Sequence, residues 1–268
     1  MSRSETLTVR SVSVDLLRQG AGEPVLYLHG VQGLSTAPGT WPPFMNAVAE
    51  RFEVFVPSHP GFAKTGRPDW YDSVTDLSDH YTDFLDALGI QTVRVIGHSF
   101  GGWVAAALAA NAPHRVERLV LASPLGIWLP EIGQTTPDVF MYSPHELVEI
   151  TYAEPTLAAD VIPADLSQSE QWFADWSSFA MYGWAPYLHD PKLIHRLHRI
   201  KAPALIVNGE KDRVVPVAHA EAFQQRIPRA QLKVVSGAGH ALPLERPDEF
   251  SAIVLDFLTR PAAQLLAR

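Results

Sequence analysis

The feature that most constrains this chain is a Gly-x-Ser-x-Gly turn, Gly97-His98-Ser99-Phe100-Gly101, which stands between a strand pattern and a helix pattern. A β-branched run at 93–96 precedes the turn, and a run of strong helix formers at 103–110 follows it. Such a turn holds its serine in a strained backbone conformation, and the glycines let the helix pass close to neighbouring strands. We therefore expect the Ser99 hydroxyl at the top of a sheet, beside a helix N-terminus that stabilises negative charge.

A serine hydroxyl reacts poorly at neutral pH, so Ser99 needs a histidine base and a carboxylate that orients this base. An apolar strand pattern leads into a turn that contains Glu210 and Asp212, and either residue places a carboxylate at a strand end. A later strand pattern leads into the glycine-rich segment that ends at His240. The chain has 11 histidines, and most of them are expected on the surface or in packing roles.

Four segments together resemble the α/β-hydrolase superfamily, and they span nearly the whole chain. The segments are His29-Gly30, Gly97-His98-Ser99-Phe100-Gly101-Gly102, Gly209-Glu210-Lys211-Asp212 and Gly239-His240. The resemblance implies the chain order serine, acid, histidine, with Ser99 as nucleophile, Asp212 as the orienting acid and His240 as the general base. Glu210 is the nearest rival to Asp212 for the role of the acid.

The resemblance also implies two main-chain donors that receive an oxyanion. The serine turn supplies the amide of Phe100. The loop that follows an early strand supplies the amide of Val31, with Gln32 as the alternative. The side chain of His29 at the start of this loop is expected to be structural.

Strand and helix patterns alternate along most of the chain, which predicts an α/β fold with a mostly parallel central sheet flanked by helices. An antiparallel hairpin is expected over 7–16 and a terminal helix over 247–258. Between Ser123 and Ile200 proline, acidic and aromatic residues replace this alternation. We therefore expect an α/β-hydrolase core of residues 1–123 and 201–268, with a helical cap insertion over 124–200.

The expected cap is rich in aromatic residues, a composition suited to an apolar pocket above the serine. Most of these rings are expected to pack within the cap or against the core. Trp128, which follows a strand end, and Trp103, which follows the serine turn, are favoured as substrate-binding residues together with Gln32.

Composition argues against several classes of function. The formal net charge is −8 and no run of lysine or arginine occurs, so nucleic acid and anionic membranes are not expected partners. The first residues hold no apolar signal core, and no later stretch is long enough to span a bilayer, so a cytoplasmic location is expected. The chain has no cysteine and no metal-ligand or nucleotide motif, so we expect neither thiol catalysis, nor a metal, nor a cofactor. Monomer and homodimer remain open.

The resemblance implies cleavage of carboxylic esters or lactones of small, largely apolar substrates through an acyl-enzyme on Ser99. An alternative is carbon-carbon bond hydrolysis, because the Gly-x-Ser-Phe-Gly-Gly turn and the aromatic cap are similar to hydrolases of vinylogous diketone ring-fission products of aromatic degradation. Those relatives commonly carry an aromatic residue after the histidine, where this chain has Ala241. They also read His-Gly-Ser-Gly-Pro-Gly where this chain reads His29-Gly30-Val31-Gln32-Gly33-Leu34. A further alternative is a ligand-binding receptor on a hydrolase scaffold.

Overall fold

A computed structural model of the chain describes residues 2–32, 34–132, 136–158, 161–163, 165–261 and 264. In this part of the chain an 8-stranded sheet has the order β1-β2-β4-β3-β5-β6-β7-β8. The strands are β1 (Arg3–Val9), β2 (Val12–Gln19), β3 (Pro24–Leu28), β4 (Glu53–Pro57), β5 (Val93–His98), β6 (Val116–Ala122), β7 (Ala204–Gly209) and β8 (Ala230–Val235). β2 runs antiparallel to β1 and β4, and the other neighbouring strands pair in parallel. The expected opening hairpin and mostly parallel sheet are confirmed.

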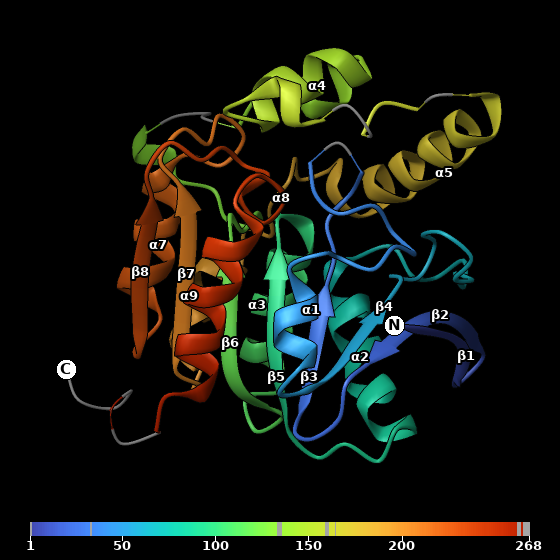
Figure 1. Cartoon of the computed structure of the whole chain (residues 1–268), viewed down its shortest axis with the longest axis vertical. Helices are drawn as coiled ribbons and strands as arrows, with labels where there is room; N and C mark the ends of the chain where they lie inside the picture. Colours follow the sequence, from blue (N-terminus) through green and yellow to red (C-terminus); the bar gives the residue numbers. More distant parts are fainter. Residues whose placement is uncertain are drawn as a thin grey trace.

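Helices cover both faces of the sheet (Figure 1). They are α1 (Met45–Ala49), α2 (Val74–Ala87), α3 (Phe100–Asn111), α4 (Pro144–Thr151), α5 (Leu166–Gly183), α6 (Leu193–Arg196), α7 (Val217–Arg226), α8 (Leu242–Glu245) and α9 (Pro247–Thr259). Side chains of α2, α3 and α7 share one core cluster with one face of the strands, and those of α1 and α9 share a second cluster with the other face. Along β6, Leu119 and Leu121 join the first cluster and Val120 joins the second, because successive strand residues point to opposite faces.

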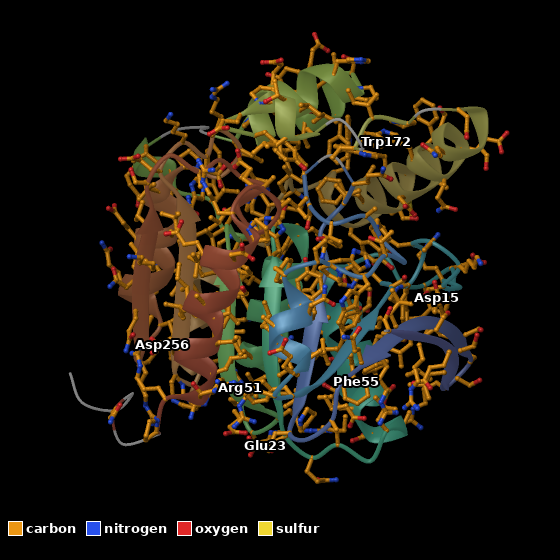
Figure 2. The ribbon with its side chains drawn as sticks, in the orientation of Figure 1. Asp15, Glu23, Arg51, Phe55, Trp172 and Asp256 are labelled. Carbon is orange, nitrogen blue, oxygen red and sulfur yellow. The ribbon has the colours of Figure 1, made fainter. Side chains whose placement is uncertain are left out.

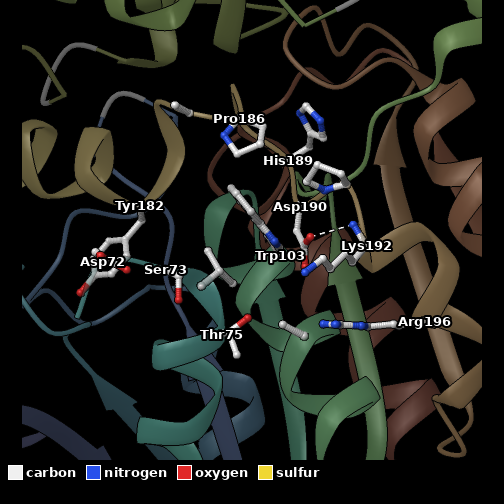
Figure 3. Close-up of a pocket in the computed structure, with 14 residues that line it drawn as sticks. Asp72, Ser73, Thr75, Trp103, Tyr182, Pro186, His189, Asp190, Lys192 and Arg196 are labelled. Carbon is white, nitrogen blue, oxygen red and sulfur yellow. Dashed lines mark hydrogen bonds between the residues drawn. The ribbon is translucent and has the colours of Figure 1, made fainter. Parts of the chain in front are cut away.

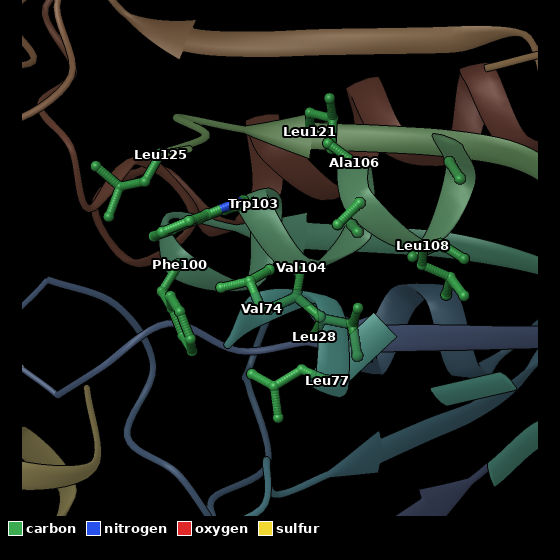
Figure 4. Packing of buried hydrophobic residues seen from close by; sticks show 14 of the residues in the cluster. Leu28, Val74, Leu77, Phe100, Trp103, Val104, Ala106, Leu108, Leu121 and Leu125 are labelled. Atoms are coloured by element: carbon green, nitrogen blue, oxygen red, sulfur yellow. The ribbon is translucent and has the colours of Figure 1, made fainter. Parts of the chain in front are cut away.

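Helix α3 is buried along almost its entire length, which fits its run of alanine, valine and leucine. Figure 4 shows Val74 and Leu77 of α2 packed beside Val104 of α3, with Leu28 of the sheet in the same cluster. Gly101 lets the start of α3 approach the sheet, since a Cβ at this position would stand 2.0 Å from the carbonyl oxygen of Leu28. This close approach fixes where the residue before α3 lies.

Between β6 and β7 the chain leaves the sheet and forms a helical insertion that contains α4, α5 and α6. Short 3-10 turns add to it: Pro130–Ile132, Val139–Met141, Pro155–Ala158 and Leu197–Arg199. In Figure 1 α4 and α5 lie above the carboxyl ends of the parallel strands. Figure 2 shows Trp172 of α5 at this end of the molecule, while Glu23 and Arg51 lie at the opposite end of the sheet. The insertion falls within the expected 124–200, of which 133–135, 159–160 and 164 lie outside the described residues, as does Gly33.

Candidate active site

Ser99 lies in the sharp turn between β5 and α3, as the glycine pattern predicts. Its backbone has φ 56° and ψ −117°, in the left-handed region that costs energy for a residue with a side chain. The amide of Ser99 donates to the carbonyl of Ala122 at 2.9 Å, and its own carbonyl accepts from the amides of Trp103 at 3.2 Å and Leu125 at 3.2 Å. These bonds to α3 and to the strand end hold the strained turn in place.

Three side chains that are far apart in sequence form one hydrogen-bonded series. His240 Nδ1 lies 2.9 Å from Asp212 Oδ2 and 3.1 Å from Oδ1, and its Nε2 lies 2.8 Å from Ser99 Oγ. A carboxylate only accepts, so Nδ1 carries the proton and donates to Asp212, which leaves Nε2 free to accept from the Ser99 hydroxyl. Ser99 and His240 are fully buried, and Asp212 is nearly so. The arrangement is that of a serine activated by a histidine base.

The structure separates Asp212 from its rival Glu210. Besides His240, Asp212 Oδ1 accepts from the amides of Val214 at 2.9 Å and Val215 at 2.7 Å, which fix the carboxylate after β7. Glu210 is exposed and instead accepts from Ser236 Oγ and from the amide of Gly237. Of the two carboxylates, Asp212 is the one that contacts the imidazole.

The loop after β3 lies against Ser99, where the sequence places the second oxyanion donor. A Cβ on Gly30 would stand 2.5 Å from the Ser35 Cβ and 3.1 Å from the Ser99 Cβ, so glycine lets the loop approach both residues. Among the described residues, the amides of Val31 and Phe100 donate to no backbone or side-chain acceptor. Two buried amides without acceptors beside a buried serine can receive an oxyanion.

Buried histidines shape this loop. His29 Nε2 accepts from the amide of His59 at 3.0 Å, so its Nδ1 donates to the carbonyl of Gly30. His59 Nε2 donates to the carbonyl of His29 at 2.8 Å, and the Tyr81 hydroxyl donates to His59 Nδ1 at 2.6 Å. Burial lowers the pKa of His29 to about 4, so the ring stays neutral and holds the loop through its two nitrogens.

Gln32 connects the same loop to the insertion. Its side-chain amide donates to the carbonyl of Val161 at 3.2 Å, and its main-chain carbonyl accepts from Trp176 Nε1 of α5 at 3.1 Å. Gln32 was expected to contact substrate or to act as the alternative oxyanion donor. The structure engages its side chain with the insertion, and both expected roles stay predictions.

The two tryptophans expected at the substrate lie in different surroundings. Trp103 is buried on α3 and lines a pocket between α2, α3 and the segment after α5. Trp128 is 37% exposed, and its ring lies 5.9 Å from that of His189. Their expected contact with substrate stays a prediction.

Sequence reasoning missed two polar residues that support the site. Ser35 Oγ accepts from the amide of Gly30 at 3.1 Å and donates to His98 Nδ1 at 2.7 Å. Glu245 accepts from the amide of Gly239, directly before His240. His98 stood inside the serine motif and so carried a signal, whereas nothing in the sequence distinguished Ser35 or Glu245.

Within the part of the chain that the structure describes, no group of histidine, cysteine or acidic side chains could hold a metal ion. Across the same residues, none of the helices has the length and apolar character needed to cross a membrane.

Comparison with known proteins identifies the family of the chain. A family model described as "Alpha/beta hydrolase family" matches residues 25–253. The chain belongs to the α/β hydrolase family. This α/β hydrolase is 31% identical over 255 residues to a 2-hydroxymuconate semialdehyde hydrolase of Pseudomonas putida, across 91% of this chain and 90% of the relative. It is 29% identical to a protein of the same name from Pseudomonas sp. (strain CF600), across 96% of this chain and 94% of the relative.

A solved structure shares the fold of this α/β hydrolase over almost its full length. The structure is a meta-cleavage product hydrolase from Pseudomonas fluorescens IP01, with a TM-score of 0.76 and 25% sequence identity. The match spans 95% of this chain and 97% of the chain in the solved structure. The expected fold class and superfamily are therefore confirmed, and the protein is a hydrolase of small molecules.

Proposed function

We propose that this α/β hydrolase cleaves a carbon-carbon bond beside a ketone or aldehyde carbonyl in a conjugated ring-fission product, through an acyl-enzyme on Ser99. The hydrogen-bonded series of Ser99, His240 and Asp212 carries the proposal, because its distances of 2.8 and 2.9 Å suit proton transfer. The choice of bond rests on the relatives, since the two curated proteins above are named 2-hydroxymuconate semialdehyde hydrolases. Ester cleavage, the first expectation from the motifs, becomes the second candidate.

In the first step the Ser99 hydroxyl attacks the carbonyl carbon while His240 Nε2 takes its proton. A bond forms between Ser99 Oγ and that carbon, and the carbonyl oxygen becomes an oxyanion that the amides of Val31 and Phe100 receive. Asp212 keeps the imidazole in the reactive tautomer and stabilises its charged form.

In the second step the oxyanion collapses and the carbon-carbon bond breaks. The substrate reacts as its vinylogous dicarbonyl tautomer, in which the proton of the 2-hydroxyl has moved to the carbon beside the cleaved bond. The electron pair of the broken bond then enters the conjugated system of the leaving fragment as an enolate, which takes the proton from His240. Water then loses a proton to His240 and attacks the acyl-enzyme, the Ser99 oxygen regains that proton, and a carboxylic acid departs. A conjugated substrate is required because an isolated carbanion would be too poor a leaving group.

Hydrolysis of esters or lactones uses the same residues and is the second candidate. Two observations favour it. Ala241 follows His240, and the oxyanion loop reads Val31-Gln32 where carbon-carbon hydrolases commonly read Ser-Gly. An ester needs no electron sink, because its leaving alkoxide takes the proton from His240 directly.

The deciding experiment compares kcat/KM for 2-hydroxymuconate semialdehyde with kcat/KM for p-nitrophenyl esters of graded acyl length. A separate sample of the protein is labelled with a fluorophosphonate to identify the reactive serine. We expect labelling at Ser99, and we expect kcat/KM to be higher for 2-hydroxymuconate semialdehyde than for any of the p-nitrophenyl esters. Ser99→Ala and His240→Ala should each lower kcat by about 10⁴-fold or more. The controls Ser11→Ala and His195→Ala change exposed residues and should leave kcat unchanged.

Each other outcome points to a different function. If the esters are hydrolysed and 2-hydroxymuconate semialdehyde is not, the protein is an esterase and the second candidate replaces the proposal. Labelling at Ser99 without any turnover would indicate a ligand-binding receptor, and absence of labelling would refute the serine chemistry.

A further inference from the structure

A pocket of about 480 Å³ lies on the seam between the core and the insertion, and no step proposed at Ser99 uses it. Its walls come from the start of α2, from α3, and from the segment that connects α5 to α6 (Figure 3). The volume falls in the range of small-molecule sites. Val74, Ala107, Tyr182 and Pro186 supply apolar surface to the walls.

One buried donor in this pocket has no partner. Trp103 is 3% exposed, and its Nε1 donates to no acceptor among the described residues. In Figure 3 this nitrogen is directed toward the end of the pocket where Asp190, Lys192 and Arg196 lie. A buried N–H without an acceptor costs free energy, so an acceptor supplied by a ligand would be favourable there.

The same end of the pocket carries an excess of positive charge. Lys192 and Arg196 form no ion pair within 4.0 Å among the described residues. Asp190 Oδ1 accepts from the main-chain amide of Lys192 at 2.7 Å, so this carboxylate is already bound to its own loop. Asp72, the other acidic residue of the pocket, lies at the far end beside Tyr182 (Figure 3). Lys192 and Arg196, without ion pairs among the described residues, therefore outnumber the Asp190 carboxylate at this end of the pocket. This local excess of positive charge occurs on a protein whose formal net charge is −8.

We propose that this pocket is a second ligand site, which binds small monocarboxylates that carry an apolar ring. The carboxylate lies between Trp103 Nε1, Arg196 and Lys192, where a planar guanidinium and an N–H donor suit its two oxygens. The ring lies against Pro186 and Val74. The site does not depend on the chemistry proposed at Ser99.

Benzoate is the probe, with benzamide as its neutral counterpart of the same shape, and binding is measured by calorimetry on the full chain. We expect benzoate to bind and benzamide to bind at least about tenfold more weakly, since a charged pair contributes more than a neutral hydrogen bond. Arg196→Met and Trp103→Phe should each weaken benzoate binding by about tenfold. The control Arg229→Met removes an exposed cation that does not line the pocket and should leave binding unchanged.

A second measurement separates this pocket from the serine. The rate of fluorophosphonate labelling at Ser99 should not change at saturating benzoate. Slower labelling would place benzoate at the serine and overturn the proposal. Equal binding of benzamide, or unchanged binding in Arg196→Met, would overturn it as well. Arg196 is a partly exposed residue, so its variant tests the site even where Trp103→Phe fails to fold.

Discussion

His98 Nε2 donates a hydrogen bond to the main-chain carbonyl of His240 at 2.9 Å, so the residue before Ser99 positions the proposed base. A carbonyl only accepts, which fixes the proton of His98 on Nε2 and leaves Nδ1 to accept from Ser35. Burial lowers the pKa of His98 to about 3, and the ring is therefore neutral near pH 7. Ser35, which donates to His98, also accepts from the amide of Gly30. The His98 ring is thereby connected to the loop after β3, which holds the proposed oxyanion donor Val31.

Replacing His98 should impair catalysis more than substrate binding. We expect His98→Ala to lower kcat by about tenfold or more with a smaller change in KM, because His240 loses a positioning bond of ~1.4 kcal/mol. His98→Gln retains an N–H donor and should recover part of the loss. Steady-state kinetics of both variants test this, with His195→Ala as the control at an exposed histidine. An unchanged kcat in folded His98→Ala would contradict the positioning role.

The contact between Trp176 and Gln32 predicts that the insertion supports the oxyanion loop. Trp176→Phe keeps an aromatic ring but removes the donor to the carbonyl of Gln32, the residue that follows Val31. We expect kcat/KM to fall by about three- to tenfold, since one buried hydrogen bond contributes ~1 kcal/mol. Trp70→Phe is the matched control, because Trp70 is 68% exposed. Equal kinetics of the two variants would show that the contact has no effect on the site.

The sequence could predict the three members of the hydrogen-bonded series because each is encoded locally. Ser99 stands between glycines at a strand-to-helix junction, and Asp212 and His240 each follow a strand. Such junctions are set by neighbouring residues, and the parallel sheet then brings the strand ends to one edge. Hence separate short motifs sufficed to predict a series that the structure joins within 3.1 Å.

The supporting contacts could not be predicted, because they join segments whose distance depends on packing. Ser35 and His98 are 63 positions apart, and Glu245 and Ala153 are 92 positions apart. No short pattern records such pairs. Trp103 illustrates the same limit: its position on α3 follows from the turn, yet only the packed insertion shows which pocket its indole N–H enters.

His80 should make the protein less stable as the pH falls. It is 1% exposed, neither ring nitrogen has a hydrogen-bond partner among the described residues, and burial lowers its pKa from 6.5 to about 4. Below pH 6.5 the His80 side chain binds a proton in the unfolded chain but stays neutral in the folded chain. The free energy of unfolding therefore decreases as the pH falls toward 4. Other buried histidines contribute in the same direction.

The variant His80→Phe removes this titration and keeps a ring between Tyr71 and Tyr81. As the pH is lowered from 6.5 to 4.5, we expect the free energy of unfolding of the variant to increase relative to that of the original protein, by up to ~1.4 kcal/mol per pH unit. Denaturant unfolding at several pH values measures this difference, and His195→Phe should leave the pH dependence unchanged because His195 is exposed. If the free energy of unfolding changes equally with pH in His80→Phe and in the original protein, His80 does not cause the loss of stability at low pH.

Glu245 joins the loop of the proposed base to the insertion, and its replacement should affect both stability and activity. Its carboxylate is 7% exposed and accepts from the amide of Gly239 at 2.6 Å and from those of Ala153 at 2.7 Å and Glu154 at 3.2 Å. In Glu245→Gln an NH₂ group must face one of these N–H donors. We expect the free energy of unfolding to fall by ~1.5–3 kcal/mol, since hydrogen bonds to a charged acceptor are lost.

Because Gly239 directly precedes His240, Glu245→Gln should also lower kcat, measured below its midpoint of thermal unfolding. Glu249→Gln on the exposed side of α9 is the matched control and should change neither stability nor kcat. A loss of stability without a loss of kcat would mean that Glu245 anchors the insertion alone. Loss of both would show that the carboxylate transmits the position of the insertion to the imidazole, as its bonds to both segments require.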